Sequence, residues 1–119
     1  MKTLQIGIMS REKFQGHVTE IAAGRYIPKK NDPKIWFSSI KSLSEVLNEN
    51  NMKLLKIIDE QKPESIKELA TICKRQPGNL SRTLNTMARY GIIEMKKIGK
   101  TSKPIAKALA FNIQYSATR

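Results

Sequence analysis

Two helices that follow one another almost without a break constrain the fold of this chain more than any other feature of its sequence. The first begins at Ser65, and Glu68 three residues later completes a capping box, in which two side chains satisfy N–H groups at the helix start. The second begins at Pro77, whose missing N–H costs nothing in a first helical turn, and Gly91 follows its end. Only the short segment 74–76 connects them. Helices joined by so tight a turn cross steeply, which predicts a helix-turn-helix arrangement.

Apolar residues recur at helical spacing in both helices, so each helix is predicted to bury one face. The two buried faces are Ile66, Leu69, Ala70 and Cys73 in the first helix, and Leu80, Leu84, Met87 and Ala88 in the second. The opposite face of the second helix, which spans 77–90, carries hydrogen-bonding side chains and no acidic residue. Its members are Asn79, Arg82, Asn85, Thr86 and Arg89.

Positive charge is concentrated in the same part of the chain. The net charge is +12, from 22 Lys and Arg against 10 Asp and Glu. Residues 1–68 hold 12 basic and 9 acidic residues, whereas residues 69–119 hold 10 basic residues and a single acid, Glu94. A positive field this concentrated attracts polyanions, either nucleic acid or an anionic membrane. Solvated faces usually mix both signs, so we expect the partner to be nucleic acid.

The beginning of the chain predicts a strand and a helix. Residues 3–8 alternate apolar and other side chains, as a short strand does. Ser10 then caps a helix that runs through about Ala23 and is ended by Gly24. The apolar stripe of this helix consists of Phe14, Val18, Ile21 and Ala22. The segment 24–34 that follows is polar, contains two prolines and is expected to have little regular structure.

Two further helices are predicted before Ser65. One starts within 36–47, and Asn48 caps the next, which Pro63 stops. Their apolar positions are Ile40, Leu43, Val46 and Leu47 in the first, and Leu54, Leu55, Ile57 and Ile58 in the second. Trp36 and Phe37 are expected to seal the junction between the N-terminal part and the core.

The segment after the helix-turn-helix pair predicts a β-hairpin with a basic tip. Residues 91–98 and 108–115 alternate in hydrophobicity, and 99–104 between them form a turn with Gly99 and two lysines. A helix-turn-helix followed by such a hairpin is a winged helix-turn-helix. We therefore predict a mainly α fold with a small β part (α+β). Its domains are a strand-helix extension and linker for dimer or partner contact (1–37) and a winged helix-turn-helix DNA-binding domain (38–119).

Residues 38–115 resemble the MarR-like winged helix-turn-helix group. The resemblance is carried by SIKELA at 65–70 and by NLSRTLNTMARYGIIEMKK at 79–97, where NLSRTL is followed by the step from Met87 to Gly91 and two isoleucines. The segment PKIWFSSIKSLSEVL at 33–47 is similar to a smaller set of regulators in bacteria and archaea, some of them antitoxins encoded beside small toxin genes. The resemblance implies a mode of action rather than a target.

The resemblance also implies roles for individual residues. Base edges would be read by Gln76, Asn79, Arg82 and Asn85. The DNA backbone would be contacted by Lys74, Arg75, Gly78, Ser81, Thr83 and Arg89, and by the wing residues Lys96, Lys97, Lys100 and Lys103. The chemistry fits, because arginine bonds guanine bidentately and asparagine does so with adenine.

The function expected from these features is that of a sequence-specific regulator of transcription. We predict that it binds double-stranded DNA as a homodimer and represses its own operon. The strand at 3–8 would pair with the strand at 108–115 of the same or of a second chain. Two alternatives remain open: an antitoxin that also neutralises a cognate toxin, and an RNA-binding or ribosome-associated basic module.

Catalysis finds little support in the sequence. His17 is the only histidine and is expected at the surface, and the only cysteine, Cys73, is expected to be a small core residue. One histidine and one cysteine make no metal-ligand cluster. We therefore expect a protein that is not an enzyme and binds no cofactor or metal. The absence of a possible disulfide, of a long apolar run and of a secretory signal favours the cytoplasm and no membrane partner.

Overall fold

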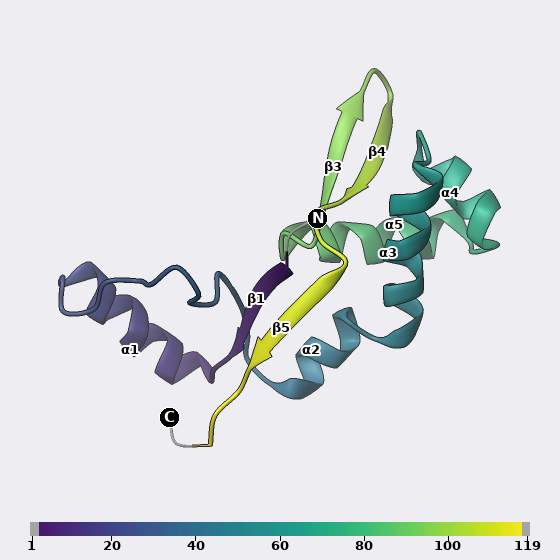
Figure 1. Cartoon of the computed structure of the whole chain (residues 1–119). Helices are drawn as coiled ribbons and strands as arrows, with labels where there is room; N and C mark the ends of the chain where they lie inside the picture. Colours follow the sequence, from purple (N-terminus) through teal and green to yellow (C-terminus); the bar gives the residue numbers. More distant parts are fainter. Residues whose placement is uncertain (1–2, 118–119) are drawn as a thin grey trace. The chain divides into compact units, whose positions relative to one another are not determined.

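The computed structural model describes residues 3–117 and shows an α+β fold (Figure 1). The elements are β1 (Thr3–Ile8), α1 (Arg11–Ala22), β2 (Ile35–Phe37), α2 (Ile40–Val46), α3 (Glu49–Gln61), α4 (Ile66–Cys73), α5 (Pro77–Arg89), β3 (Ile93–Ile98), β4 (Thr101–Ala106) and β5 (Ala110–Gln114). None of the helices among the described residues combines the length and the apolarity that crossing a membrane requires.

The described residues form two compact units. The helical unit consists of 46–110, and the sheet unit consists of 3–45 with 111–117. Each unit is described by itself below. The domains predicted from the sequence, 1–37 and 38–119, remain a prediction.

Local signals define the helix ends in the helical unit. Asn48 caps α3, because its Oδ1 accepts from the N–H of Asn51 at 2.9 Å. Ser65 caps α4 by accepting from the N–H of Glu68 at 3.1 Å. The Glu68 carboxylate accepts from the N–H of Glu64 at 3.0 Å, whereas the capping-box pattern predicts that it accepts from the N–H of Ser65. Both caps were therefore correctly predicted, with this one shift.

The core of the helical unit lies between α3, α4, α5 and the base of the β3–β4 hairpin. Its residues are at most 2% exposed and include Leu54, Leu55, Ile58, Leu69, Leu80, Leu84, Met87, Ile92 and Ile93. The predicted apolar faces of α3 and α5 supply most of this core. Ile66, Cys73 and Ala88 lie at its margin and are half-buried rather than buried.

The hairpin differs from its prediction. β3 pairs antiparallel with β4, from Ile93 opposite Ala106 to Ile98 opposite Thr101, and the turn is Gly99–Lys100. The prediction that 99–104 is a turn and 108–115 the second strand of the hairpin was wrong. Pro104 and the lysines give the segment 101–106 the composition of a loop. A two-stranded ribbon tolerates this proline because both of its strands are edge strands.

The sheet unit contains a three-stranded sheet in the order β2-β1-β5. Figure 1 shows β1 and β5 side by side. The predicted pairing of the strand at 3–8 with the C-terminal strand is therefore present within one chain. β2 pairs parallel with β1, with Gly7 opposite Trp36 and Ile8 opposite Phe37. The sequence analysis assigned no strand to 35–37. Phe37 is only 2% exposed.

Helix α1 connects β1 to β2 and contains no buried residue. Ser10 caps it as predicted, by accepting from the N–H of Lys13. The predicted apolar stripe is buried only at Phe14, and only in part, whereas Val18 is 46% and Ile21 36% exposed. Helical periodicity correctly places these residues on one stripe of α1, but the rest of the sheet unit does not cover this stripe. Ile40 of α2, also predicted to be buried, is 53% exposed.

Candidate nucleic-acid interface

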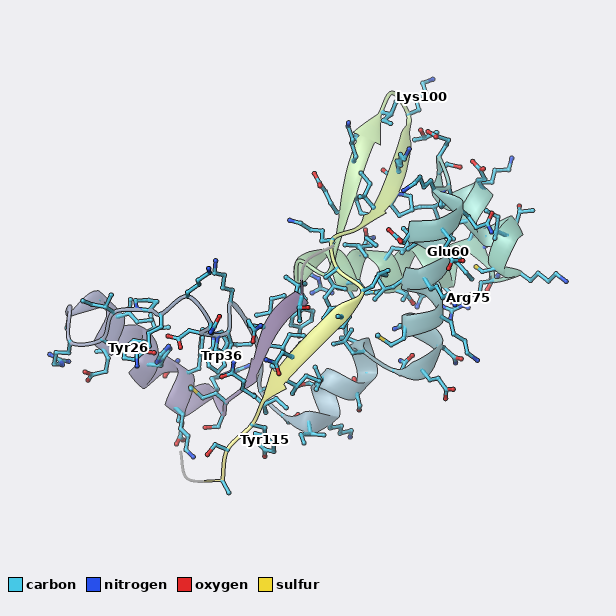
Figure 2. All side chains as sticks on the ribbon, in the orientation of Figure 1. Tyr26, Trp36, Glu60, Arg75, Lys100 and Tyr115 are labelled. Atoms are coloured by element: carbon cyan, nitrogen blue, oxygen red, sulfur yellow. The ribbon has the colours of Figure 1, made fainter. Side chains whose placement is uncertain are left out.

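The turn between α4 and α5 is fixed by bonds within the helical unit. Lys74 is exposed and adopts the left-handed conformation with φ 57°, and its N–H donates to the carbonyl of Ala70. The N–H of Arg75 donates to the same carbonyl at 3.2 Å. Nη2 of Arg75, which Figure 2 labels, donates to the carbonyl of Asn50 at 3.3 Å. Arg75, predicted as a phosphate contact, thus also ties the turn to the start of α3.

The predicted base-reading residues lie on one exposed side of α5. Gln76, Asn79, Arg82 and Asn85 are all exposed. Nδ2 of Asn79 donates to Oε1 of Gln76 at 3.2 Å, and Oδ1 of Asn79 accepts from Nη2 of Arg82 at 3.4 Å. We call this run of three side chains, Gln76, Asn79 and Arg82, the α5 polar row. Asn85 lies one turn further along the helix and outside the row.

The start of α5 is open to the approach of another molecule. Gln76 is the N-cap residue, and its side chain makes no capping hydrogen bond. A side-chain carbon added at Gly78 would meet no atom within 4 Å, and the first turn contains no acidic residue. The N–H groups at a helix start favour negative charge. This geometry suits the predicted phosphate contact at Gly78.

The other residues of α5 that are predicted to contact the DNA backbone differ in whether their hydrogen-bond donors are already bonded within the protein. Oγ1 of Thr83 donates to the carbonyl of Asn79 at 3.2 Å, so its single proton already serves the helix. Ser81 is half-buried. Arg89 is exposed and donates from Nη2 to Oγ1 of Thr86 at 3.4 Å, which uses one of the five guanidinium N–H groups. Arg89 is therefore better placed than Thr83 to bond a phosphate.

The four predicted wing lysines also differ. Lys96, Lys97 and Lys100 are exposed, and Lys100 lies at the tip of the hairpin (Figure 2). Nζ of Lys103 lies 3.2 Å from Oε1 of Glu64, and the side chain of Lys103 is 24% exposed. Part of the charge of Lys103 is thus neutralised within the helical unit. The three exposed lysines are the ones that suit a phosphate contact.

Acidic residues do not oppose the positive charge of α5. The helix itself contains no acid, and the ion pairs that the described part of the helical unit contains join Lys56 to Glu60 and Lys103 to Glu64. Both pairs are on the surface, where a pair contributes at most about 1 kcal/mol. Arg82 and Arg89 of α5 thus take part in none of the ion pairs among the described residues.

An aromatic cluster in the sheet unit was not predicted. The ring of His17 lies 5.1 Å from that of Tyr26 and 5.6 Å from that of Trp36, and the rings of Phe14 and Trp36 are 6.0 Å apart. His17 is half-buried between two rings on a helix with no buried residue, and these ring contacts were not part of the expectation of a surface histidine. Trp36 comes from β2, and this strand, which the sequence analysis missed, brings the rings together.

Hydrogen bonds in the 24–34 connection shift two pKa values. The hydroxyl of Tyr26 donates to the carboxylate of Asp32, and this bond raises the pKa of Tyr26 above its usual value. The N–H of Lys29 donates to the same carboxylate at 2.8 Å. That backbone bond, followed by the bond from Tyr26, lowers the pKa of Asp32. Within the described residues no group of three His, Cys, Asp or Glu side chains could hold a metal ion.

Comparisons with known proteins bear on the helical unit most directly. The family model described as HVO_A0114 matches residues 46–113, more than half of the chain. The "CRISPR locus-related putative DNA-binding protein Csa3" of Saccharolobus solfataricus is 27% identical over 106 residues. That match covers 89% of this chain and 42% of the relative, so the chain spans less than half the length of the curated relative. No solved structure matches the chain significantly.

Proposed function

The chain belongs to the HVO_A0114 family, and we propose that it is a transcriptional regulator that binds double-stranded DNA in a sequence-specific way. The α5 polar row carries this proposal, because it presents hydrogen-bonding groups on an exposed helix side that lacks acidic residues. The Saccharolobus solfataricus relative, whose name contains the words "putative DNA-binding protein", supports the same class of function.

In this proposal α4, α5 and the β3–β4 hairpin work as a winged helix-turn-helix of the MarR-like type. Helix α5 enters the major groove. Arg82 bonds guanine, and the amide side chains on the same side of α5 suit adenine. Arg89 and the exposed hairpin lysines contact phosphates, which fixes the register of the protein on the duplex.

The proposed regulator acts as a homodimer in the cytoplasm. Each copy presents one α5 to one half-site, as paired recognition helices do. Occupying the site would block transcription of its own operon by steric exclusion. This mode of action needs no cofactor and no metal, and we propose that the protein is not an enzyme.

Two alternative functions rank below this one. An antitoxin would also bind a toxin, but residues 1–37 carry 7 basic against 3 acidic residues and would repel a basic ribonuclease toxin. An RNA-binding module would stack bases on exposed aromatic rings. The aromatic residue next to α5 is Tyr90, which is half-buried.

The decisive experiment compares two arginines of the same helix. The preferred duplex is first selected from a random library, and each variant is then titrated on that duplex and on a scrambled one at a single salt concentration. Arg82→Ala should lose about 1–3 kcal/mol of affinity on the selected duplex and much less on the scrambled one. Arg89→Ala, the matched control, should weaken binding to both duplexes nearly equally.

Equal losses for Arg82→Ala on the two duplexes would show that Arg82 only contacts phosphate. If the wild-type protein selects no sequence from the library, the proposed function is wrong. Selection of single-stranded RNA over duplex DNA in a parallel titration would favour the RNA-binding alternative instead.

A further inference from the structure

Strand β5 is an edge of the sheet within the described residues, because its neighbour in the order β2-β1-β5 is β1 alone. An edge strand presents a row of backbone N–H and C=O groups to another chain. Proteins usually blunt such an edge with charged residues or proline. The stretch 108–118, which contains β5, has neither a charged residue nor a proline. It is also the longest uncharged run of the sequence.

The two faces of β5 are chemically different. Asn112 and Gln114 donate to Oε1 of Gln5 on β1 at 3.0 and 3.3 Å, so these amides share one face of the sheet. Because side chains alternate along a strand, Ile113 and Tyr115 point to the other face. They are 46% and 63% exposed, and Figure 2 shows Tyr115 at the end of β5.

The exposed pair continues an apolar surface. On β1, the residues that alternate with Gln5 are Leu4, Ile6 and Ile8, and the last two are 0% and 7% exposed. Ile113 and Tyr115 thus extend, at the edge of the sheet, a face that is already buried further in. A strand added alongside β5 would cover both.

The charge of the chain identifies the kind of strand that fits. An acidic partner would be drawn to the basic surfaces of the protein, and β5 offers it no cation. A second copy has the same net charge of +12, so local repulsion between two copies is smallest where an edge carries no charge. We propose that β5 pairs antiparallel with β5 of a second copy, and that this pairing forms the homodimer on which the proposed function rests.

Two-fold symmetry suggests the register of this pairing. Identical edge strands related by a two-fold axis perpendicular to the sheet run antiparallel, and each contact occurs twice. With the axis at Ile113, this residue faces the partner's Ile113, and Phe111 faces the partner's Tyr115. The opposite face then pairs Asn112 with the partner's Gln114. Apolar side chains meet apolar ones and amides meet amides, and the two sheets become one.

The test compares two variants, each of which replaces one exposed isoleucine by lysine. Ile113→Lys puts two positive charges opposite each other across the axis, which opposes pairing. Ile27→Lys, in the 24–34 connection, adds the same charge at a residue that is 79% exposed and outside the sheet. By sedimentation equilibrium the wild type and Ile27→Lys should be dimers at micromolar concentration, and Ile113→Lys should be a monomer. Far-ultraviolet circular dichroism checks that each variant is folded.

A second measurement covers the case in which Ile113→Lys does not fold. In a Cys73→Ser background, Ile113→Cys should be linked to its counterpart by a short bis-maleimide, and Ile27→Cys should not. A monomeric wild type, a dimeric Ile113→Lys variant or equal linking at both positions would overturn the proposal. DNA titration separates this inference from the proposed function. A dimer linked through residue 113 that selects no DNA sequence would refute the function alone, and a DNA-binding dimer unaffected by Ile113→Lys would refute the interface alone.

Discussion

Asn79 sits in the middle of the α5 polar row and uses both ends of its amide there. Its nitrogen donates to Gln76 and its oxygen accepts from Arg82. The bond to Asn79, at 3.4 Å between two exposed side chains, favours one direction of the Arg82 guanidinium in the free protein. In the proposed DNA complex this preorganisation would lower the conformational entropy that Arg82 loses on binding.

Removing the amide should therefore weaken the action of Arg82 as well. We expect the losses of affinity for the selected duplex caused by Asn79→Ala and Arg82→Ala to be non-additive, with a coupling of about 0.5–3 kcal/mol. A double-mutant cycle of titrations on that duplex measures the coupling. Additive losses within error would show that the two side chains act independently.

Gly7 is the glycine whose replacement the structure penalises most clearly. A carbon added to it would lie 2.3 Å from Cζ3 of Trp36, so the indole would have to move. Gly7→Ala should lower the free energy of unfolding by about 1–3 kcal/mol, the usual cost of overpacking. Gly16→Ala on α1, where a side-chain carbon meets no atom within 4 Å, is the matched control. It should raise stability by about 0.5–1 kcal/mol, because alanine favours a helix over glycine.

Urea titration followed by the fluorescence of Trp36, the only tryptophan, measures both variants in the sheet unit. If Gly7→Ala has the same urea midpoint of unfolding as the wild type, the Trp36 indole can move away from residue 7 at no cost in stability. A destabilised Gly16→Ala would indicate that α1 contacts something at Gly16.

At the scale of elements, the parts that the sequence predicted correctly are those with local signals. Ser10, Asn48 and Ser65 each accept from a helix N–H three residues later, and such caps are visible as residue types at fixed spacing. The exposed side of α5 followed from helical periodicity in the same way. Strand β2 was missed because three residues carry no periodicity, and its existence depends on pairing with β1.

Long-range contacts explain what was missed in the candidate site. Arg75 bonds a carbonyl 25 residues away, and Lys103 pairs with an acid 39 residues away. No spacing rule reaches across such distances. The sequence therefore identified the basic residues of this region, but it could not separate those held within the protein from those that are exposed.

The 24–34 connection should respond to pH through the bond between Tyr26 and Asp32. The folded pKa of Asp32 lies below its usual value of 3.8, so its stabilising contribution is complete above that pH and is lost as the pH falls through the folded pKa. The folded pKa of Tyr26 lies above 10.0, so its contribution is complete below that pH and is lost as the pH rises through the folded pKa.

Tyr26→Phe removes this bond and offers a direct measurement. In an ultraviolet titration of tyrosine ionisation, the wild type should show a phase above pH 10.0 that the variant lacks. Asp32→Asn should move that phase to lower pH, since the bond to the carboxylate is the largest cause of the raised pKa of Tyr26. An unchanged titration in both variants would show that the bond does not form in solution.

At the scale of the whole molecule, charge should act in opposite directions on the two proposed interfaces. DNA binding releases counterions, so affinity should fall as salt rises, with a log–log slope of about −0.9 per phosphate neutralised. Dimerisation brings together two copies with a net charge of +12, and salt screens that repulsion. The dimer should therefore become tighter over the same range of salt in which DNA binding weakens.

Two lysines of the hairpin test the first half of this expectation. Lys100→Ala should reduce the magnitude of the salt slope by about one unit. Lys103→Ala should change it less, because Lys103 is already paired with Glu64. The slopes come from DNA titrations at several salt concentrations, and sedimentation at the same concentrations gives the dimer constant. A dimer that weakens with added salt would mean that attraction between charges holds the copies together.

The exposure of the α5 polar row has an evolutionary consequence. Leu80, Leu84 and Met87 are 0% exposed and fix the place of the helix, whereas Gln76, Asn79 and Arg82 bond one another on the exposed side. Substitutions of the buried residues change the stability of the helical unit, whereas substitutions in the α5 polar row leave its core unchanged. If α5 reads DNA as proposed, descendants of this chain could therefore acquire new target sequences through a few substitutions on one side of α5 that leave the core of the helical unit unchanged.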